Sequence, residues 1–297
     1  MKRVLRMMIA MVGLGLLTII PQSVMAQGNG LLTSAILMQD AAISTPHIQL
    51  RFLHPKYETF QDEFFSSEIS LNSGSYMLSG SLPVGERGAL QISIPYYSIN
   101  QTSTFTFFGE SETMKMDEAG IGNIMVNWVQ KLSKSAEGLQ SYTSVGVNLP
   151  TASEEAFIAA LNNYYDIFSM LDESMTLRAS YIGVTTGQNI SFSFELGPDY
   201  WIYTGDQSNV DPEFFAHYGF GVTFTPITNL SLRGEWVGLG ILSEEDVDFG
   251  DRWEHQLAIG ARFQAGRFVP GLFWMKNMGD LGDLYESAFG FELGVDL

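Results

Sequence analysis

The amino-acid sequence predicts an all-β protein: one antiparallel, up-and-down β-barrel of about twelve strands that spans a membrane. Three observations support this fold. Apolar and polar residues alternate along many short stretches, the connections between them alternate between short and long, and negative charge gathers in the long connections. A membrane barrel with short turns at one end and longer loops at the other has these features.

Composition excludes several other classes of protein. The chain has 297 residues, 45% of them hydrophobic and 16% charged, with 21 Phe, 12 Tyr, 5 Trp and no Cys. The aromatic content excludes a disordered chain, and the absence of Cys excludes disulfide scaffolds and thiolate metal sites. The formal net charge of −18 argues against a nucleic-acid partner, because phosphate binding needs clusters of Lys and Arg.

Residues 1–26 predict a cleaved signal peptide. Lys2, Arg3 and Arg6 come first, an apolar run follows over 7–20, and small residues around Ala26 fit a signal-peptidase site. An uncleaved membrane helix is the alternative, but a span needs about 20 apolar residues. The removed segment holds three of the 15 basic residues and none of the 33 acidic ones, so the mature chain carries a net charge of −21.

The segment 27–45 precedes the first predicted strand and is apolar in patches between Leu31 and Ile43. We expect it to be a candidate for a partial plug of the barrel lumen. The barrel itself is predicted to occupy residues 46–297, with no further domain boundary.

The predicted strands show a period of two, with one apolar face each. The clearest are Leu90–Ile94, Ile190–Phe194 and the alternating stretch that begins at Phe289 and ends the chain. An even number of strands is typical of bacterial outer-membrane barrels. The predicted strands are 46–54, 74–84, 89–99, 119–132, 139–149, 174–185, 190–203, 214–225, 230–241, 253–263, 268–276 and 285–297.

The connections between these strands fall into two classes. Five are short and carry turn residues: 85–88, 133–138, 186–189, 226–229 and 264–267. Six are long: 55–73, 100–118, 150–173, 204–213, 242–252 and 277–284. The long connections together carry a net charge of −20 and the short ones +1, so nearly all of the charge lies at one rim.

Aromatic residues are expected in girdles at the membrane interfaces. Five of them lie where predicted strands meet long connections, and Trp128 lies near a short one. The five are Tyr200, Trp236, Trp253, Trp274 and Tyr285. The alternative is that these rings belong to the core of an ordinary β-sandwich.

If the apolar face of each strand meets lipid, the opposite face lines the lumen and holds charges of both signs. Such residues should face water or one another, because an ion in hydrocarbon is costly. They either form a salt-bridge lattice that stiffens the barrel or a graded lining that a solute contacts. The candidates are Arg51, Asn123, Asn127, Arg178, Glu195, Arg233, Glu235, Glu254, Arg262, Phe273 and Glu292.

The connection 150–173 predicts a short amphipathic helix. Thr151 and Glu154 fit a capping box, and apolar residues follow at helical spacing. The helix either folds into the barrel mouth as a constriction or rests on the rim against lipopolysaccharide acyl chains. The constriction candidates are Phe157, Leu161, Tyr164 and Tyr165.

Signals for catalysis and metal binding are weak. The four His residues stand beside no Ser in a recognisable acyl-transfer motif, and no short-spaced His pair suggests a metal site. Carboxylates in one long connection are a weak Ca²⁺ candidate, although such a run is more often simply solvated. They are Glu244, Glu245, Asp246 and Asp248. No cofactor is expected.

Three motifs resemble a known family. They are the hairpin Ser81–Tyr96, the strand opening Gly120-Ile121-Gly122-Asn123, and the strand end Leu149-Pro150-Thr151-Ala152. In this order they resemble the outer-membrane barrels assigned to the MetA pathway of phenol degradation. Asn123 stands where that family has Asp, and Ala152 where it has Gly. The resemblance covers roughly residues 75–152 and implies a transporter-like barrel for small, often hydrophobic compounds.

Together these observations predict a channel in the bacterial outer membrane for passive uptake of small hydrophobic or amphipathic solutes. Its expected partners are outer-membrane lipid, lipopolysaccharide and the solute. One alternative is a structural or adhesive barrel whose acidic loops bind divalent cations or a partner. A barrel enzyme that modifies lipid is a further alternative.

Overall fold

A computed structural model describes residues 35–39, 46–56, 65–71, 73–107, 110–133, 138–160, 166–206, 210–243, 252–278 and 287–297. The predicted signal peptide lies outside these residues. Among the described helices, none is long and apolar enough to cross a membrane.

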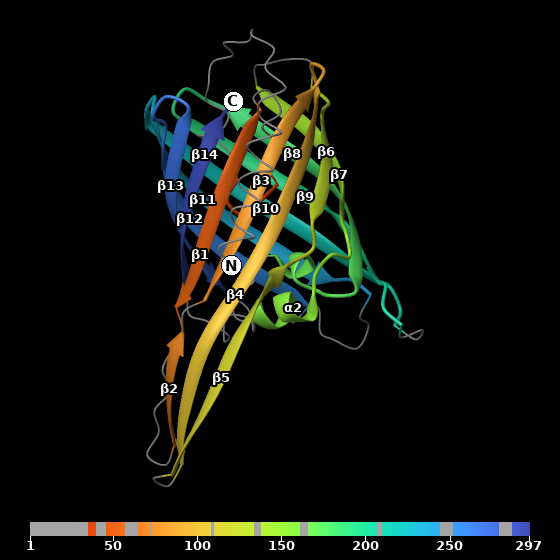
Figure 1. Cartoon of the computed structure of the whole chain (residues 1–297). Coiled ribbons are helices and arrows are strands. Elements are labelled where there is room, and N and C mark those ends of the chain that lie inside the picture. Colours follow the sequence, from red (N-terminus) through yellow and green to blue (C-terminus); the bar gives the residue numbers. More distant parts are fainter. Residues whose placement is uncertain are drawn as a thin grey trace.

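Twelve antiparallel strands close into a barrel, as predicted (Figure 1). The barrel strands are β1 (His47–Lys56), β3 (Gly74–Val84), β4 (Gly88–Phe107), β6 (Met125–Lys131), β7 (Leu139–Asn148), β8 (Ser174–Thr186), β9 (Ile190–Tyr203), β10 (Glu213–Ile227), β11 (Leu230–Ile241), β12 (Trp253–Phe263), β13 (Phe268–Asn277) and β14 (Ser287–Asp296).

Closure occurs where the first strand meets the last. β1 pairs with β14 from His47 opposite Asp296 to Lys56 opposite Ser287, and with β3 on its other side. The ring then continues from β3 through β4 to β6 and back through consecutive hairpins to β14. Closed pairing leaves no unpaired edge in the ring, which is the condition for a sheet to cross hydrocarbon.

The short connections lie at one end of the barrel, the upper end in Figure 1. Three of them contain a glycine with positive φ, a region that L side chains rarely adopt: Gly85 at 69°, Gly138 at 77° and Gly266 at 66°. The last residue, Leu297, lies at the same end and donates its N–H to Pro46 O at 2.9 Å. The strand ends joined by the long connections lie at the opposite end.

The barrel exterior is apolar. Large hydrophobic side chains alternate with inward-facing residues along the strands and are well exposed, for example Leu272 (66%) and Phe220 (60%). The inward face carries buried polar and charged side chains instead. This is the apolar-out, polar-in alternation of a membrane-spanning barrel.

Two of the predicted loops contain strands. Within 100–118, β4 continues to Phe107 and β5 (Glu110–Ile121) returns beside it, while β2 (Phe65–Leu71) within 55–73 pairs with the other side of β4. These strands form a three-stranded sheet that projects beyond the barrel (Figure 1). Both loop predictions were wrong. β5 was not predicted because nearly all of its described side chains are exposed, so its sequence shows no apolar face.

The predicted strand 119–132 is divided. β5 ends at Ile121 and β6 begins at Met125, and Gly122 lies in the break with its N–H on Pro95 O. A Cβ at Gly122 would lie 2.2 Å from Ser169 O, so only glycine lets the connection after β7 pack this closely. One aromatic prediction also changes, because Trp236 lies in the middle of β11 and not at its end.

The connection 150–173 forms helix α2 (Glu154–Ala160) and a short 3₁₀ turn, η2 (Ile167–Ser169). The predicted cap was wrong: Ser153 Oγ accepts from Ala156 N–H, whereas Thr151 Oγ1 donates to Gly122 O. Hydrogen bonds from its own backbone N–H and from Ser153 hold the pKa of the Glu155 carboxyl below its usual value.

Candidate functional site in the barrel lumen

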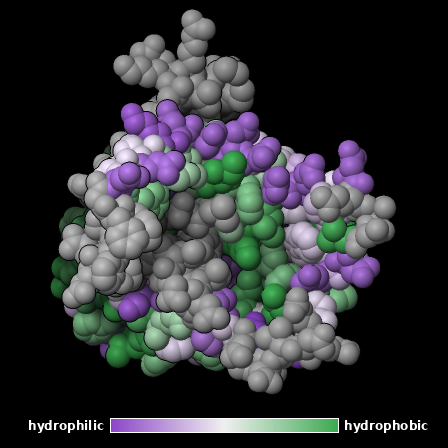
Figure 2. All heavy atoms as spheres, turned by 90° about the horizontal axis from the view of Figure 1, so that it is seen from below, coloured by the Kyte–Doolittle hydropathy of each residue, from purple (hydrophilic) through white to green (hydrophobic). Residues whose placement is uncertain are grey.

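The barrel encloses a cavity of about 400 Å³. Its walls come from β1, β3, β4, β6 and β8–β12, together with residues 35–39. Both polar and apolar side chains line it, including Gln49, Ser93, Met125, Phe215 and Leu239. Seen from the end of the long connections, hydrophilic residues lie along the rim and hydrophobic residues lie in the depression inside it (Figure 2).

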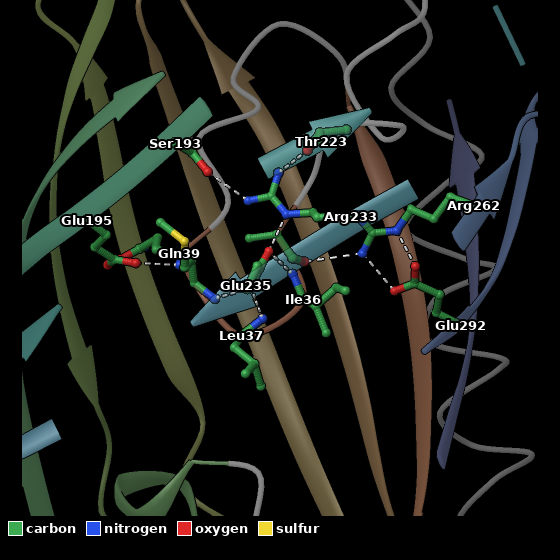
Figure 3. A network of polar contacts seen from close by, with 12 residues as sticks. Ile36, Leu37, Gln39, Ser193, Glu195, Thr223, Arg233, Glu235, Arg262 and Glu292 are labelled. Atoms are coloured by element: carbon green, nitrogen blue, oxygen red, sulfur yellow. Dashed lines mark hydrogen bonds and ion pairs between the residues drawn. The ribbon is translucent and has the colours of Figure 1, made fainter. Parts of the chain in front are cut away.

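Residues 35–39 lie inside the barrel and are bound to its wall through Glu235 of β11 (Figure 3). Glu235 Oε1 accepts the N–H of Ile36 at 2.8 Å, and Oε2 accepts those of Leu37 at 2.6 Å and Met38 at 3.1 Å. Gln39 N–H donates to Glu195 Oε2 of β9 at 2.7 Å. Two luminal carboxylates therefore hold four consecutive backbone amides.

Arginines complete this attachment. Arg233 pairs with Glu235 and donates to Thr223 Oγ1 at 3.0 Å and to Ser193 Oγ at 3.1 Å. Arg51 Nη1 donates to Ile36 O at 2.8 Å. The carbonyls and the amides of the segment are thus both bound by side chains of the barrel wall.

A second ion cluster lies beside it on β1, β12 and β14. Glu292 pairs with Arg262 and accepts from Arg262 Nη2 at 2.9 Å, Arg51 Nε at 3.2 Å and Gln49 Nε2 at 2.8 Å. Arg262 Nη2 also donates to Ala35 O at 3.2 Å. Glu235 and Glu292 are each only 1% exposed, and a buried charge is tolerated only when it is paired and hydrogen-bonded in this way.

A separate cluster joins β8, β9 and β10 on the opposite side of the segment. Asp199 of β9 accepts from Arg178 Nε at 2.7 Å and lies 2.7 Å from His217 Nδ1 of β10. His217 Nε2 lies 2.9 Å from Ser180 Oγ of β8 and 3.5 Å from Glu195 Oε1. Arg178 also pairs with Asp166 Oδ2 at 3.5 Å.

The structure distributes the eleven predicted lumen residues among different environments. Some line the cavity: Arg51, Asn127, Arg178, Glu195 and Glu254. Four others form ion pairs with one another: Arg233, Glu235, Arg262 and Glu292. Phe273 belongs to a buried apolar cluster with Ile36 and the alanines of α2.

Asn123 is the exception among them, because its side chain anchors a loop. Its Nδ2 donates to Phe168 O at 3.0 Å and to Leu171 O at 2.6 Å, and its Oδ1 accepts from Thr151 N at 3.0 Å and Ala152 N at 2.9 Å. All four hydrogen-bonding positions of the amide are used. Asn123 therefore holds the connection after β7 against the barrel.

The predicted constriction is described only in part. Phe157 packs on the apolar cluster that joins α2 to β1, β4, β12 and β13, while Leu161, Tyr164 and Tyr165 lie outside the described residues. Phe168 of η2 makes an edge-to-face contact with Phe215 of β10, with ring centroids 5.0 Å apart. The connection thus contacts the inward face of the barrel at the long-connection end.

The predicted Ca²⁺ candidates, Glu244, Glu245, Asp246 and Asp248, also lie outside the described residues. Within the described part of the chain, no group of three or more His, Asp or Glu side chains is arranged to hold a metal ion.

Sequence reasoning missed the cluster around His217. Asp199 and Ser180 share the inward face with the predicted residues Glu195 and Arg178, so alternation alone places them in the lumen. Their convergence depends on the pairing of three strands, with Arg178 opposite Asp199 and Gly197 opposite His217. That register cannot be read from separate strands.

No protein-family model matches this chain, and no curated protein sequence matches it. Several solved structures are similar to it in part. The NanC porin is 7% identical, with 85% of this chain and 98% of that chain covered and a TM-score of 0.48. The translocator domain of the autotransporter NalP from Neisseria meningitidis is 10% identical, covering 85% and 88%, with a TM-score of 0.44. The CymD monoaromatic hydrocarbon channel is 8% identical, covering 85% and 88%, with a TM-score of 0.41.

Proposed function

We propose that this protein is an outer-membrane channel for the passive passage of small, amphipathic or hydrophobic solutes. The observation that carries the proposal is the cavity of about 400 Å³ inside a closed twelve-stranded barrel with an apolar exterior. A barrel of this size is intermediate between filled eight-stranded barrels and open sixteen-stranded porins. Its lumen therefore suits single small molecules better than a wide column of water.

The lining supports an amphipathic solute. Met125, Phe215 and Leu239 supply apolar surface, while Asn127 supplies an amide that is 1% exposed and has no hydrogen-bond partner on either side-chain atom. A buried amide without a partner is costly, and a polar group of a passing solute would satisfy it. Successive weak contacts of both kinds lower the barrier to passage without trapping the solute.

The segment 35–39 acts as a plug in this account. It occupies the lumen, and Glu235 holds three of its backbone amides. Passage then proceeds along the cavity beside the segment and increases when the segment is released.

Cellular location and solute follow from the same proposal. The predicted signal peptide and the apolar exterior both support a location in the outer membrane. The resemblance of residues 75–152 to the MetA-pathway barrels favours small aromatic compounds as the first solutes to test. The acidic long connections, with a net charge of −20, disfavour anions at the mouth.

The test is solute flux into liposomes that contain the refolded protein. A panel should compare phenol-sized aromatics, a neutral sugar and an aromatic anion of equal size. Faster entry of the neutral aromatics than in protein-free liposomes supports the proposal, with the anion slower than its neutral counterpart. Equal entry with and without folded protein for every solute would reject it.

A second candidate function is a partner-binding or adhesive barrel. The observation in its favour is the projecting sheet of β2, β4 and β5, in which β5 exposes Glu110, Glu112 and Asp117. Cell-surface binding that needs divalent cations and is lost when the β4–β5 hairpin is shortened would favour this function. A solute flux that survives the same shortening would assign transport to the barrel alone.

A further inference from the structure

The cluster on β8, β9 and β10 contains the geometry of an acyl-transfer site. Ser180 Oγ lies 2.9 Å from His217 Nε2, and His217 Nδ1 lies 2.7 Å from Asp199 Oδ2. The hydroxyl, the imidazole and the carboxylate are therefore linked in a row. Hydrolases with a catalytic triad use this order for the nucleophile, its general base and the group that orients the base.

Asp199 fixes which ring nitrogen of a neutral His217 imidazole carries the proton. Its side chain is fully buried and its second oxygen accepts from Arg178 Nε at 2.7 Å, so it is held as an ionised acceptor. An ionised carboxylate can accept hydrogen bonds but cannot donate one. In the neutral imidazole the proton therefore lies on Nδ1, which donates to Asp199. The lone pair of Nε2 then faces the hydroxyl of Ser180.

Gly197 makes this contact possible. Ser180 and His217 lie on β8 and β10, with β9 between them, and Gly197 of β9 stands opposite His217. A Cβ at Gly197 would lie 3.0 Å from His217 Cε1 and 1.8 Å from Ala179 O. The imidazole thus crosses β9 where that strand has no side chain.

The surroundings of the cluster include a route for a small substrate and a carboxylate that stabilises positive charge. His217 and Arg178 line the luminal cavity, together with the apolar side chain of Phe215. Glu195 Oε1, 3.5 Å from Nε2, stabilises an imidazolium, and Arg178 lies on the same face of β8 as Ser180. The nearby carboxylates disfavour an anionic substrate.

We propose that Ser180, His217 and Asp199 form a hydrolytic site in the lumen that cleaves small, uncharged carboxylic esters. Ser180 Oγ bonds to the ester carbonyl carbon while its proton moves to His217 Nε2. The bond from that carbon to the alcohol oxygen breaks, and the alcohol leaves with the proton from Nε2. Water then attacks the acyl-serine, its proton returns through Nε2 to Ser180 Oγ, and the carboxylic acid is released.

This proposal goes beyond transport, and it requires only that a small ester reach the cavity. Ser180 is 4% exposed, which limits the substrate to molecules small enough to enter the lumen. Gln39 of that segment donates to Glu195, so the plug and the hydrolytic site share a side chain.

The first experiment labels the folded full-length protein in detergent with a fluorescent fluorophosphonate and identifies the modified residue by mass spectrometry. We expect label on Ser180, no label at that position after heat unfolding, and none in Ser180→Ala. Ser144→Ala is the matched control, because Ser144 lies opposite Ser180 on β7, is equally buried and contacts no imidazole. Labelling spread over surface residues, or none in protein shown to be folded, would overturn the proposal.

The second experiment follows hydrolysis of p-nitrophenyl acetate. His217→Gln is expected to lower the rate by about 10²-fold or more, the usual contribution of a general base, while Ser144→Ala retains the native rate. Equal rates in the native protein and Ser180→Ala would overturn the proposal.

If Ser180→Ala does not fold, Ser180→Cys replaces it. The thiol of Ser180→Cys should react with iodoacetamide faster than the thiol of Ser144→Cys. Equal reactivity of the two thiols counts against activation by His217. Flux through the native protein reports on the channel separately.

Discussion

Glu235 and Ile36 lie 199 positions apart and are joined by a hydrogen bond of 2.8 Å from the backbone N–H of Ile36 to the buried carboxylate. The same carboxylate accepts from Leu37 and Met38, and Arg233 balances its charge. Glu235 therefore holds three of the four bound amides of the segment 35–39 against the barrel wall. This attachment keeps the segment in the lumen of the barrel.

The first prediction concerns release of the segment by Glu235→Ala. Hydrogen bonds to charged groups contribute about 1.5–3 kcal/mol each, and this change removes three of them from the segment. In a Met38→Cys background, where the chain has no other Cys, we expect Glu235→Ala to raise the rate of thiol labelling at least tenfold. Glu86→Gln, which removes the same charge at an exposed turn, is the control and should leave the rate unchanged. Equal labelling in all three proteins would mean that Glu235 does not hold the segment.

The second prediction concerns lipid contact along a single strand. Leu272 lies in the middle of β13 and Phe268 at its short-turn end, and both point outward. Arginine at the bilayer midplane costs about 2–4 kcal/mol and near the interface about 0–1 kcal/mol. Unfolding titrations in lipid vesicles should therefore show a much larger loss of stability for Leu272→Arg than for Phe268→Arg. Equal losses would contradict the assigned membrane position of the barrel.

The third prediction concerns the loop anchored by Asn123. Asn123→Ala leaves backbone groups of Thr151, Ala152, Phe168 and Leu171 without this partner. Unpaired buried groups cost about 1–3 kcal/mol, so we expect the connection after β7 to detach while the barrel stays closed. Limited proteolysis should cut within 150–173 faster than in the native protein, with unchanged heat-modifiable migration on a gel. Cleavage at the native rate would show that other contacts suffice to dock the loop.

The fourth prediction concerns the projecting hairpin. β4 pairs with β6 only over Gly88–Ser93, whereas its continuation pairs with β5 and β2. Replacing residues 103–114 by an Asn-Gly turn should leave the barrel able to fold, because that part of the sheet lies outside the ring. Circular dichroism and gel migration of the refolded protein measure this. Failure to fold would assign the hairpin a role in closing the barrel.

The sequence predicted the barrel well because its main signal is local. Alternation along β11 or β14 needs only neighbouring residues, and the Gly-containing turns mark the strand ends. β5 was not predicted because its side chains are exposed on both faces. The contact of His217 with Ser180 and Asp199 was not predicted because it depends on the register of three strands and on the absence of a side chain at Gly197. The attachment of Ile36 to Glu235 depends on closure of the whole ring.

The most direct measurement of the central claim is single-channel conductance in a planar bilayer under a salt gradient, with the native protein and Glu235→Ala side by side. We expect discrete, cation-preferring steps from the native protein, because the long connections are acidic. We expect larger steps from Glu235→Ala, because the segment leaves the lumen. Silence from both proteins, when both are demonstrably folded and inserted, would contradict a channel through this barrel.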